Sequence, residues 1–428
     1  MKRVVIVECI STSMNYVHDL RELGYEPIIL ETYNDDGGHQ EARRQENYKA
    51  MEKPLPARFS ASKFYDQTLL LVKELNPVLV LPGSEMSVEL ATTLANDLGL
   101  PCNPKENLGQ MTRKFEMHNA LKRAGLRYIH GTMAKTLEEA LQFFHSLQDH
   151  AVVLKPTHSA GSLSVFVCQN EDEIKNGFNQ ILGSVDMFGQ TNDAVLVQEC
   201  IQGEEYIVNT ITRKGKSYIS AMYKYQKVQL QGGAKLYDVT ENITEAELGR
   251  HPEFREMMQY ALDVNRAIGI EYGPVHAEFM IDEKGPVLIE VNCRICGGDM
   301  TSKFLDTMHG HHETNRSLEA YLDAAGFEAH YKAGYKPAGK GYFKTIITPY
   351  DCDIVDAPVV RFAKQLESFI NVTGIEEHAK RHMPRTIDLY SNGGKIALAH
   401  KDPQIVEADE RKLDDLLKNH FEEAFTLA

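Results

Sequence analysis

Short apolar runs alternate with amphipathic stretches over about the first hundred residues of the chain. Three runs, at 3–9, 27–31 and 77–82, read RVVIVEC, PIILE and PVLVLP, and each is continuous rather than alternating. Continuous apolar runs are typical of parallel strands that are covered on both faces. The stretches between them are helical in character, including one that ends at 69–75. Strands that alternate with helices predict βαβ units, so we expect a doubly wound parallel sheet here.

The pattern of apolar positions changes after residue 150. The segment 151–167, AVVLKPTHSAGSLSVFV, predicts a strand, a loop of small residues and a second strand, as in a hairpin. GPVHAEFMI at 273–281 and GPVLIEVN at 285–292 predict another strand pair joined by a short turn. One continuous helix is predicted at 106–125 and a long one at 252–268. This mixture predicts an α+β architecture after the N-terminal α/β sheet.

Length and charge narrow the class of protein. The chain has 428 residues, and a usual size of about 150 residues per domain predicts roughly two to four domains. The formal charge is 46 − 61 = −15. A surface this acidic argues against nucleic acid or an anionic membrane as the main partner, because both are polyanions. Any phosphate group that binds therefore needs a local basic pocket.

Targeting signals and disulfides are not expected. No apolar run reaches the ~20 residues that cross a bilayer. The start, MKRVVIVEC, carries two basic residues as a signal peptide would, but its apolar run of about six residues suits a buried strand better. The seven cysteines are an odd number and widely scattered, unlike a disulfide framework. A cytoplasmic location is the expectation.

Two acids and an amide on the second strand pair form a candidate metal site. The predicted turn would place Glu278 opposite Glu290, with Asn292 on the same side as Glu290. Two carboxylates and an amide oxygen make a hard-oxygen site suited to Mg²⁺. Without a cation, acids this close would repel each other and raise the pKa of one. The alternative is an ordinary solvated strand face.

The same stretch, LIEVNCRICGGDM, contains two cysteines at C-x-x-C spacing. Arg294 would continue the face of the acids, whereas Cys293 and Cys296 would point elsewhere. A zinc site needs four ligands, and no second C-x-x-C completes one. His276 and the HGHH run at 309–312 are the remaining candidate ligands, although adjacent histidines in a polar loop are usually solvated. The oxygen ligands are therefore favoured over the thiols.

Two further segments have the composition of a nucleotide site. Lys155 precedes the small-residue loop THSAGSLS at 157–164, whose backbone N–H groups could approach a polyanion closely. Most such loops are only turns. A lysine that ends an apolar strand, however, lies where burial of its charge is costly, which favours a functional role. The segment 197–208, VQECIQGEEYIV, predicts strand, turn and strand, and reads as an ordinary hairpin by composition alone.

Taken in order, these motifs resemble the ATP-grasp superfamily of carboxylate–amine ligases over residues 1–325, and more loosely beyond. The resemblance implies an ATP-grasp fold, α/β and α+β, in which two α+β lobes sandwich ATP after a pre-grasp domain. It implies four parts: an N-terminal pre-grasp α/β domain, a central lobe with the phosphate loop and hinge, a C-terminal lobe with the metal hairpin, and an α+β subdomain. Their expected bounds are 1–105, 106–204, 205–325 and 326–428.

The resemblance also implies roles for individual residues. The ATP contacts it implies are Lys114 and Lys155 on the phosphates, Ser159, Gly161 and Ser162 in the loop over them, Glu199 and Ile201 on adenine, and Glu205 on ribose. Glu278, Glu290 and Asn292 match the ligands of Mg²⁺ (or Mn²⁺). Arg294, Lys155 and Ser162 match the groups that act on the transferred phosphoryl group. One position departs from the usual loop S-x-G-S-x-G-V, because its last glycine is Ser164 here.

Within the superfamily the details look most like the L-amino acid ligases. PGSE at 82–85, HAEF at 276–279 and GGKIALAHKDPQIVEAD at 393–409 fit that group. The substrate contacts implied are Glu85, His276, Arg294, Gly297 and Gly298, with the segment 224–237 as a further pocket wall. The chain does not match the biotin carboxylases, because their E-H-P-V stretch has no counterpart after Asn292. Purine-pathway ligases share E-V-N-x-R and remain a rival.

The expected activity is formation of an amide or peptide bond from a carboxylate and an amine, through an acyl phosphate, with release of ADP and phosphate. The cofactors implied are ATP and a divalent cation, and the partners are small molecules such as amino acids. Members of this group are often dimers through the N-terminal domain. A nucleotide-binding regulator without catalysis is the alternative from another class, and the complete set of two acids and an amide argues against it.

Overall fold

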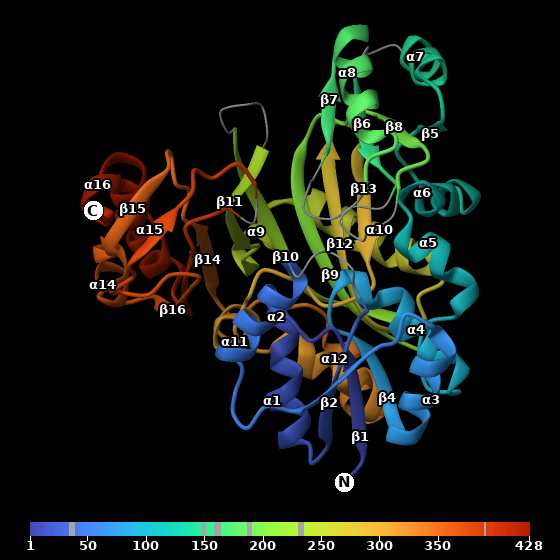
Figure 1. Cartoon of the computed structure of the whole chain (residues 1–428), viewed down its shortest axis with the longest axis horizontal. Coiled ribbons are helices and arrows are strands. Elements are labelled where there is room, and N and C mark those ends of the chain that lie inside the picture. The colour runs from blue at the N-terminus through green and yellow to red at the C-terminus, as the bar shows by residue number, and fades with distance from the viewer. Residues whose placement is uncertain (34–38, 148–150, 158–163, 186–190, 230–234, 389–390) are drawn as a thin grey trace.

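The computed structural model of the chain describes residues 1–33, 39–147, 151–157, 164–185, 191–229, 235–388 and 391–428. Its N-terminal part is a parallel sheet with the strand order β3-β2-β1-β4, at the bottom of Figure 1. The elements of this part are β1 (Arg3–Val7), α1 (Asn15–Glu22), β2 (Glu26–Glu31), α2 (His39–Ala50), β3 (Ala57–Ser60), α3 (Tyr65–Leu75), β4 (Pro77–Pro82) and α4 (Val88–Asp97), with short 3₁₀ turns at Ser11–Met14 and Glu85–Ser87.

Strand β1 explains why its sequence is apolar without alternation. Val4 and Ile6 pack in one hydrophobic cluster, and Val5 and Val7 pack in another on the opposite face of the sheet. All four side chains are fully buried because helices cover both faces. The predicted doubly wound parallel sheet is confirmed.

The central lobe is an antiparallel sheet with the order β5-β8-β6-β7, at the top of Figure 1. Its elements are β5 (Gly131–Ala134), α7 (Leu137–Ser146), β6 (Val152–Pro156), β7 (Phe166–Cys168), α8 (Glu171–Ile181) and β8 (Val195–Glu199). Strands β6 and β7 form the predicted hairpin, with Val152 opposite Cys168. Helices α7 and α8 pack on this sheet through a shared apolar cluster.

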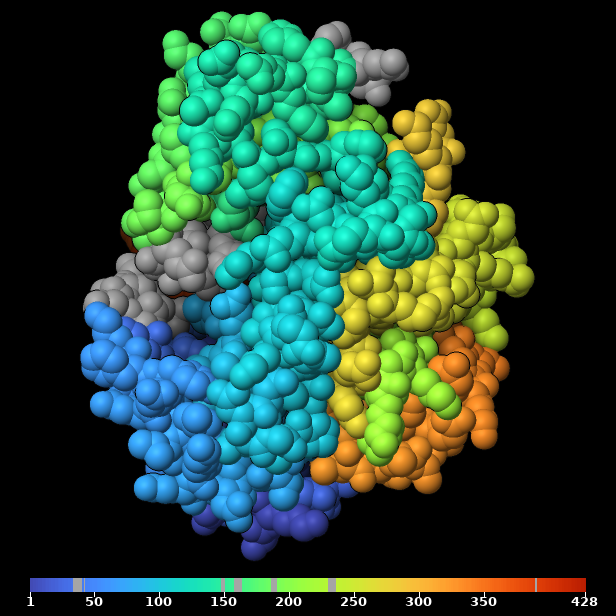
Figure 2. All heavy atoms as spheres, turned by 90° about the vertical axis from the view of Figure 1, so that its right-hand side faces the viewer, coloured from blue at the N-terminus to red at the C-terminus, as the bar shows by residue number. Residues whose placement is uncertain are grey.

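The single helix predicted at 106–125 is wrong. A 3₁₀ turn at Lys105–Asn107 and helix α5 (Leu108–Thr112) precede helix α6 (Lys114–Arg123), and the backbone of Arg113 between them is extended, at φ −114° and ψ 115°. No proline or glycine marks this break, so the hydrophobic pattern does not reveal it. Figure 2 shows this cyan stretch between the green lobe and the blue N-terminal part, beside the yellow α10. The break lets Lys114 begin a new helix at the edge of the cleft described below.

The largest sheet of the described residues has the order β13-β12-β9-β10-β11-β14-β18-β16. Its strands are β9 (Glu204–Arg213), β10 (Lys216–Gln229), β11 (Lys235–Asn242), β12 (Tyr272–Asp282), β13 (Gly285–Asn292), β14 (Lys340–Thr345), β16 (Phe369–Thr373) and β18 (Lys395–His400). The sheet runs through the predicted boundary at 325, since β14, β16 and β18 extend it. The four domain bounds stay predictions.

The segment 197–208 is not the hairpin that its composition suggested. Strand β8 ends at Glu199 in the sheet of the central lobe, and β9 begins at Glu204 in the largest sheet. Residues 200–203 therefore connect two sheets rather than turning a strand back on itself. A strand–turn–strand sequence looks the same whether it forms a hairpin or connects two sheets. The strands that pair with β8 and β9 lie elsewhere in the chain, so the local sequence does not reveal which case holds.

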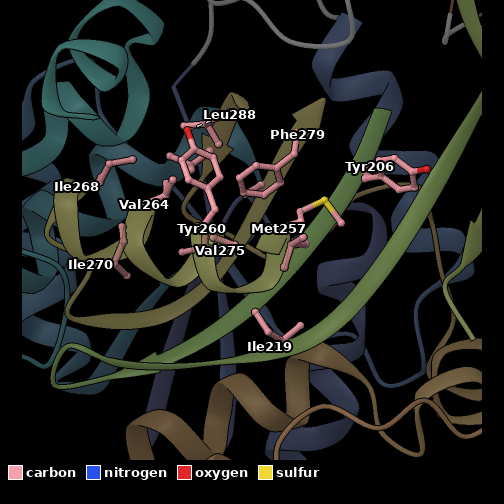
Figure 3. Packing of buried hydrophobic residues seen from close by; sticks show 14 of the residues in the cluster. Tyr206, Ile219, Met257, Tyr260, Val264, Ile268, Ile270, Val275, Phe279 and Leu288 are labelled. Carbon is pink, nitrogen blue, oxygen red and sulfur yellow. Dashed lines mark hydrogen bonds between the residues drawn. The ribbon is translucent and has the colours of Figure 1, made fainter. Parts of the chain in front are cut away.

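One face of the largest sheet is closed by helix α10 (Pro252–Ile268), which confirms the predicted long helix. Met257, Tyr260, Val264 and Ile268 recur on one side of the helix and pack against the sheet (Figure 3). The sheet residues in this core include those that alternate with the polar ones: Tyr206 and Val208 on β9, Val275, Ala277 and Phe279 on β12, and Val291 on β13. The intervening residues therefore face the other way.

The remaining elements surround this sheet. They are α9 (Glu245–Arg250), α11 (Ser302–His309), α12 (Glu313–Leu322), α13 (Ala324–Ala333), β15 (Cys352–Asp356), α14 (Pro358–Lys364), β17 (Arg381–Met383), α15 (Pro403–Asn419), α16 (Phe421–Ala424) and β19 (Thr426–Leu427). Strands β17, β15 and β19 make a small sheet near the C-terminus, at the left of Figure 1. No helix in the described part of the chain is long and apolar enough to cross a membrane.

Candidate active site

A cleft of about 3210 Å³ opens on the polar face of the largest sheet. On that face, the register brings Asn209, His276 and Asn292 into one row across β9, β12 and β13. The next row holds Ile207, Glu278 and Glu290. The predicted opposition of the two acids is confirmed. A bulge lies between Glu278 and Phe279, where β13 has one extra residue.

Lys114 enters the cleft from the start of α6 and pairs with one of these acids. Its Nζ lies 2.5 Å from Glu290 Oε2, and both side chains are nearly buried. Asn292 Nδ2 donates to the other oxygen of Glu290 at 3.3 Å. Burial alone would raise the pKa of Glu290, but the nearby Lys114 ammonium overcomes it and lowers the pKa to about 2. Glu290 is therefore ionised at neutral pH.

Lys155 projects into the same cleft from the end of β6. It is 8% exposed, and in the described part of the chain no acidic oxygen lies within 4 Å of its Nζ. Burial lowers the pKa of Lys155, the Lys114 charge adds to this, and the pKa falls to about 8. A buried ammonium without a partner is costly, so the site favours any anion that approaches it.

The acids Glu278 and Glu290 with Asn292 fit a hard divalent cation. The side chain of Glu278 is 14% exposed, and the imidazole of His276 lies 3.5 Å from its carboxylate. Two carboxylates and an amide side by side give oxygen donors on one face of a rigid strand pair. Among the described residues no group of three or more His, Cys, Asp or Glu side chains is arranged for a metal ion.

The N-terminal domain contributes an acid to the opposite wall of the cleft. Arg294 Nη2 donates to Glu85 Oε2 at 3.1 Å, which joins residues 209 positions apart. Burial raises the pKa of Glu85, and the charge of Arg294 opposes that rise. Gly83 allows this approach, because a Cβ there would lie 2.5 Å from the carbonyl oxygen of Glu8. The glycine of the P-G-x-E segment is therefore required on steric grounds, because a side chain there would clash with the backbone of Glu8.

His276 belongs to a row of hydrogen bonds beneath the cleft. Its Nδ1 lies 2.9 Å from Asn209 Oδ1, and its Nε2 faces Glu278 Oε1. The pKa of His276 is raised to about 10: burial opposes the rise, and Cys296 and Glu278 promote it. Since a thiol is mostly uncharged at neutral pH, we attribute the effective attraction to Glu278.

The residues expected to bind the nucleoside line the other end of the cleft. Glu199 accepts a hydrogen bond from the backbone N–H of His130 at 2.9 Å, and Ile201 follows it in the connection between the two sheets. Lys227 Nζ lies 2.5 Å from Glu205 Oε2. Burial, helped by the charge of Glu278, raises the pKa of Glu205, and Lys227 opposes that rise.

Sequence reasoning missed several residues at this site. Lys227 was covered only as part of a pocket wall, and Gln198, whose buried Oε1 has no partner among the described residues, was not singled out. Asn209 could have been found, because it follows Glu205 and Ile207 at a spacing of two on one strand face. No local signal marks Glu313, which reaches this site from a separate helix.

The loop residues Ser159, Gly161 and Ser162 lie outside the described residues. Ser164, at the end of that loop, has φ 56°. This left-handed conformation is one that glycine adopts at lower cost than serine. The usual glycine at this position of the motif therefore matches a real backbone requirement, which Ser164 meets under strain.

The two thiols of the C-x-x-C stretch lie in different surroundings, and part of the histidine run is buried. Cys293 packs in the core under α10. Cys296 lines the cleft, so the expectation that it points elsewhere is wrong: its spacing of two from Arg294 already assigns it to the face of the acids. The expectation that the run at 309–312 is solvated is wrong. His309 is buried against Tyr223, and His312 lies between Asp19 and Asp306 at 3.0 and 2.8 Å.

Gly297 and Gly298 line the cleft between Arg294 and the N-terminal domain. The segment that follows them is tied to the loop after β1. Asp299 N donates to Ser11 Oγ at 2.9 Å, and Met300 N donates to Thr12 Oγ1 at 3.2 Å. Lys395 Nζ reaches Asp299 Oδ2 at 3.2 Å. The backbone beside the two glycines is therefore held from two sides.

Comparisons with known proteins find related sequences. The ATP-grasp domain family matches residues 148–303. The chain is 28% identical to Dapdiamide A synthase of Enterobacter agglomerans over 360 residues, or 81% of each chain. It is 22% identical to the L-arginine-specific L-amino acid ligase of Bacillus subtilis over 226 residues, or 52% of each chain.

Solved structures agree on the fold. An L-amino acid ligase from Bacillus licheniformis superposes with a TM-score of 0.75 at 16% identity, covering 100% of this chain and 98% of that one. Phosphoribosylglycinamide synthetase from Anaerococcus prevotii superposes with a TM-score of 0.69 at 13% identity, over 100% and 99% of the two chains. The chain therefore contains an ATP-grasp domain and has the architecture of the ATP-dependent carboxylate–amine ligases.

Proposed function

We propose that this ATP-grasp ligase joins the carboxylate of one amino acid, or of a related acid, to the amine of another, through an acyl phosphate. The observation that carries the proposal is the Glu85–Arg294 pair in the wall of the cleft, beside the acids Glu278 and Glu290. One carboxylate and one guanidinium at 3.1 Å match the ammonium and carboxylate of an α-amino acid. The relatives named as an L-amino acid ligase and Dapdiamide A synthase support the same class.

The nucleotide end of the cleft has the charges that phosphoryl transfer requires. Lys114, Lys155 and Arg294 converge on the cleft and would hold the phosphates and stabilise the negative charge that develops on the transferred group. Glu278, Glu290 and Asn292 would hold a divalent cation, which supplies neutralisation of phosphate charge when bound. Lys114 would then exchange part of its pairing with Glu290 for the nucleotide.

The two substrates would meet near Arg294 and the two glycines. The carboxylate oxygen of the first substrate attacks the γ-phosphorus, the bond to ADP breaks, and an acyl phosphate forms. The amine of the second substrate attacks the acyl carbon, and inorganic phosphate leaves. Gly297 and Gly298 have no side chains, so their backbone could approach the acyl group closely. Enclosure in the cleft would limit hydrolysis of the acyl phosphate.

The rival functions differ in the molecule that stimulates turnover. A purine-pathway ligase would need a pocket for a phosphoribosyl amine, and the fold alone does not separate the two, since both kinds of structure superpose on this chain. A regulator without catalysis would not need two facing strand acids, Glu278 and Glu290, of which one is paired with Lys114. The buried, matched Glu85–Arg294 pair favours a zwitterionic substrate.

A screen of substrate pairs tests the proposal. Purified protein is incubated with ATP, Mg²⁺ and pairs of amino acids, ADP formation is measured, and products are identified by mass spectrometry. We expect ADP formation that depends on amino acids and a product whose mass equals the two substrates minus water. Stimulation by a phosphoribosyl amine alone would favour the purine-type rival. ADP formation that no tested amine or acid stimulates would favour the regulator.

A further inference from the structure

A small groove of about 100 Å³ lies on the outer side of the central lobe. It is bounded by helices α6 and α7 and by the start of strand β5, all at the right of the lobe in Figure 1. Phe115, His118, Asn119 and Lys122 recur on one face of α6 at spacings of three and four, and that face lines the groove. None of the proposed cation ligands lines it. The groove is therefore distinct from the phosphate end of the cleft.

Two buried side chains that line the groove have polar atoms without a partner. His118 is 3% exposed and Gln198 is 2% exposed. His118 Nε2 and Gln198 Oε1 are both buried, and neither has a hydrogen-bond partner among the described residues. The backbone of Ile289 lies near the imidazole, but not in the geometry of a hydrogen bond. Buried polar atoms that stay unpaired are costly, so these two atoms favour a polar ligand in the groove.

The two unpaired atoms are one donor and one acceptor. The backbone N–H of Ile129 donates to His118 Nδ1 at 3.4 Å, so that nitrogen carries no proton. The proton of the neutral imidazole then lies on Nε2, which makes Nε2 a donor. Burial, helped by the charge of Lys155, lowers the pKa of His118 to about 3, which agrees with a neutral ring. Gln198 Oε1 is an amide oxygen and can only accept.

The walls of the groove are largely aromatic. Phe115 and Phe143 contribute rings from α6 and α7, and the rings of Tyr128 and His130 stack with their centroids 4.6 Å apart. Aromatic walls and a small volume favour a flat ligand of about one ring. A primary amide accepts through its oxygen and donates through its N–H groups, which matches the donor and the acceptor of the groove. A carboxylate has no such donor.

The groove and the cleft share part of one wall. Ile129 and Gln198 line both of them. Gln198 is on β8, directly before Glu199, the residue expected to contact adenine. A ligand that holds Gln198 Oε1 from the groove would therefore restrict a side chain of the nucleotide site.

We propose that this groove is an effector site for a small, uncharged aromatic amide, and that its occupancy changes the affinity of the cleft for ATP through Gln198. The amide oxygen of the ligand accepts from His118 Nε2, and its N–H donates to Gln198 Oε1. The ring of the ligand lies between the aromatic side chains of α6 and α7. The inference goes beyond amide ligation, because it involves only this ligand and ATP and not the amino-acid substrates.

Binding of benzamide to the full chain tests the chemistry of the groove. Benzoate has nearly the same shape but is an anion without a donor, and acetophenone keeps the carbonyl group but has no N–H. Calorimetry should give saturable binding of benzamide with a Kd on the order of 1 mM, as expected for so small a ligand. The two analogues should bind at least about fivefold more weakly, because each leaves Gln198 Oε1 unpaired. Absence of saturable benzamide binding would overturn the inference, as would equal binding of all three molecules.

Substitutions on α6 and β8 locate the binding. Gln198→Leu removes the acceptor at similar volume and should weaken benzamide binding about fivefold. Asn119→Phe fills the groove from a half-buried position that does not line the cleft, so it should abolish benzamide binding and leave ATP binding intact. Arg123→Phe puts the same side chain at an exposed position of α6 outside the groove and is the matched control. Benzamide binding that persists in Asn119→Phe, or that is lost equally in Arg123→Phe, would overturn the assignment.

Titration of ATP with and without saturating benzamide tests the link to the cleft. We expect the Kd for ATP to change about threefold or more in the wild-type protein and not in Asn119→Phe. The Kd for benzamide should change by the same factor when ATP is saturating, because coupling between two binding sites is reciprocal. An unchanged Kd for ATP would overturn the effector role, and complete exclusion of benzamide by ATP would place it in the cleft instead. If the protein ligates no amino acids, the proposed function fails, while these binding measurements still decide the inference.

Discussion

Two buried lysines on strands, Lys155 and Lys344, have opposite surroundings. Lys344 is 2% exposed, and its Nζ lies 2.6 Å from Asp238 and 3.1 Å from Asp414. Lys155 is 8% exposed, has no acid within 4 Å among the described residues, and faces the cleft. Its pKa falls to about 8 because of burial and the neighbouring Lys114. A buried charge that the protein does not neutralise is free to act on a ligand.

The C-terminal network is closed on itself. Tyr342 Oη donates to Asp414 at 2.5 Å, and Lys418 pairs with the same carboxylate. Burial would raise the pKa of Asp414, but its hydrogen bonds from Lys418 and Tyr342 lower it. Strand β14 shows the contrast within three residues, because Phe343 and Thr345 line the cleft and Lys344 between them joins α15 to the sheet. Between these two lysines, the neutralised charge of Lys344 holds elements together, whereas Lys155, without an acidic neighbour among the described residues, faces the cleft.

The largest loss of activity is expected on substitution of Glu290, the cleft acid that pairs with Lys114. Glu290→Gln should lower amino-acid-dependent ADP formation by about 10³-fold, because it removes a carboxylate from the cation site and the partner of Lys114. Circular dichroism should show a folded protein. Glu283→Gln, at an exposed acid in the turn of the same hairpin, is the control and should keep wild-type turnover. Unchanged ADP release in Glu290→Gln would remove the metal assignment.

Arg294→Ala should reduce kcat by about 10²-fold or more, on the scale of losing one transition-state donor. It also leaves Glu85 buried without its guanidinium, so part of the loss comes from the pairing itself. Steady-state kinetics for each substrate separate the roles. A raised KM for one amino acid with kcat preserved would instead make Arg294 a substrate anchor.

Matched methionine substitutions compare the two lysines directly. Lys344→Met should lower the free energy of unfolding by about 3 kcal/mol, because Asp238 and Asp414 lose their shared buried partner. ADP formation by the folded variant should be nearly unchanged. Lys155→Met should keep the free energy of unfolding within about 1 kcal/mol and weaken ATP binding roughly 10- to 100-fold. Urea titration measures the free energy of unfolding, and calorimetry measures ATP binding. Equal losses of unfolding free energy in the two variants would contradict the contrast between Lys155 and Lys344.

The smallest expected effect is a pH dependence of nucleotide binding. Lys155 attracts phosphate only when protonated, and its pKa of about 8 in the free protein lies below the ordinary 10.5. ATP affinity measured by calorimetry should therefore be flat below pH 8 and fall by up to about tenfold per pH unit above it. Lys155→Met should not show this fall. The same pKa predicts that Lys155 adds stability as pH rises from 8 to 10.5, because the unfolded chain holds the proton longer.

Sequence alone located much of the site because strand alternation is a local property. A period of two assigns Glu278, Glu290 and Asn292 to one face and the core residues to the other, and the short turn at 282–285 fixes the register between the strands. Lys155 was singled out because it ends an apolar strand before a loop of small residues, and the order of motifs identified the superfamily. The N-terminal parallel sheet followed from continuous apolar runs that alternate with helical stretches, and the helix at 252–268 was also predicted from local sequence.

What the tertiary structure decided is which distant residues face each other. Glu313 reaches Asn209 across 104 positions, and Glu85 reaches Arg294 across 209, without any shared local pattern. The burial of the histidines at 309–312, the break at Arg113 and the crossing between sheets after Glu199 were likewise missed. Local periodicity tells which side of an element a residue occupies. Only the order of strands and the docking of helices determine what lies opposite, because those contacts join segments that the chain itself keeps apart.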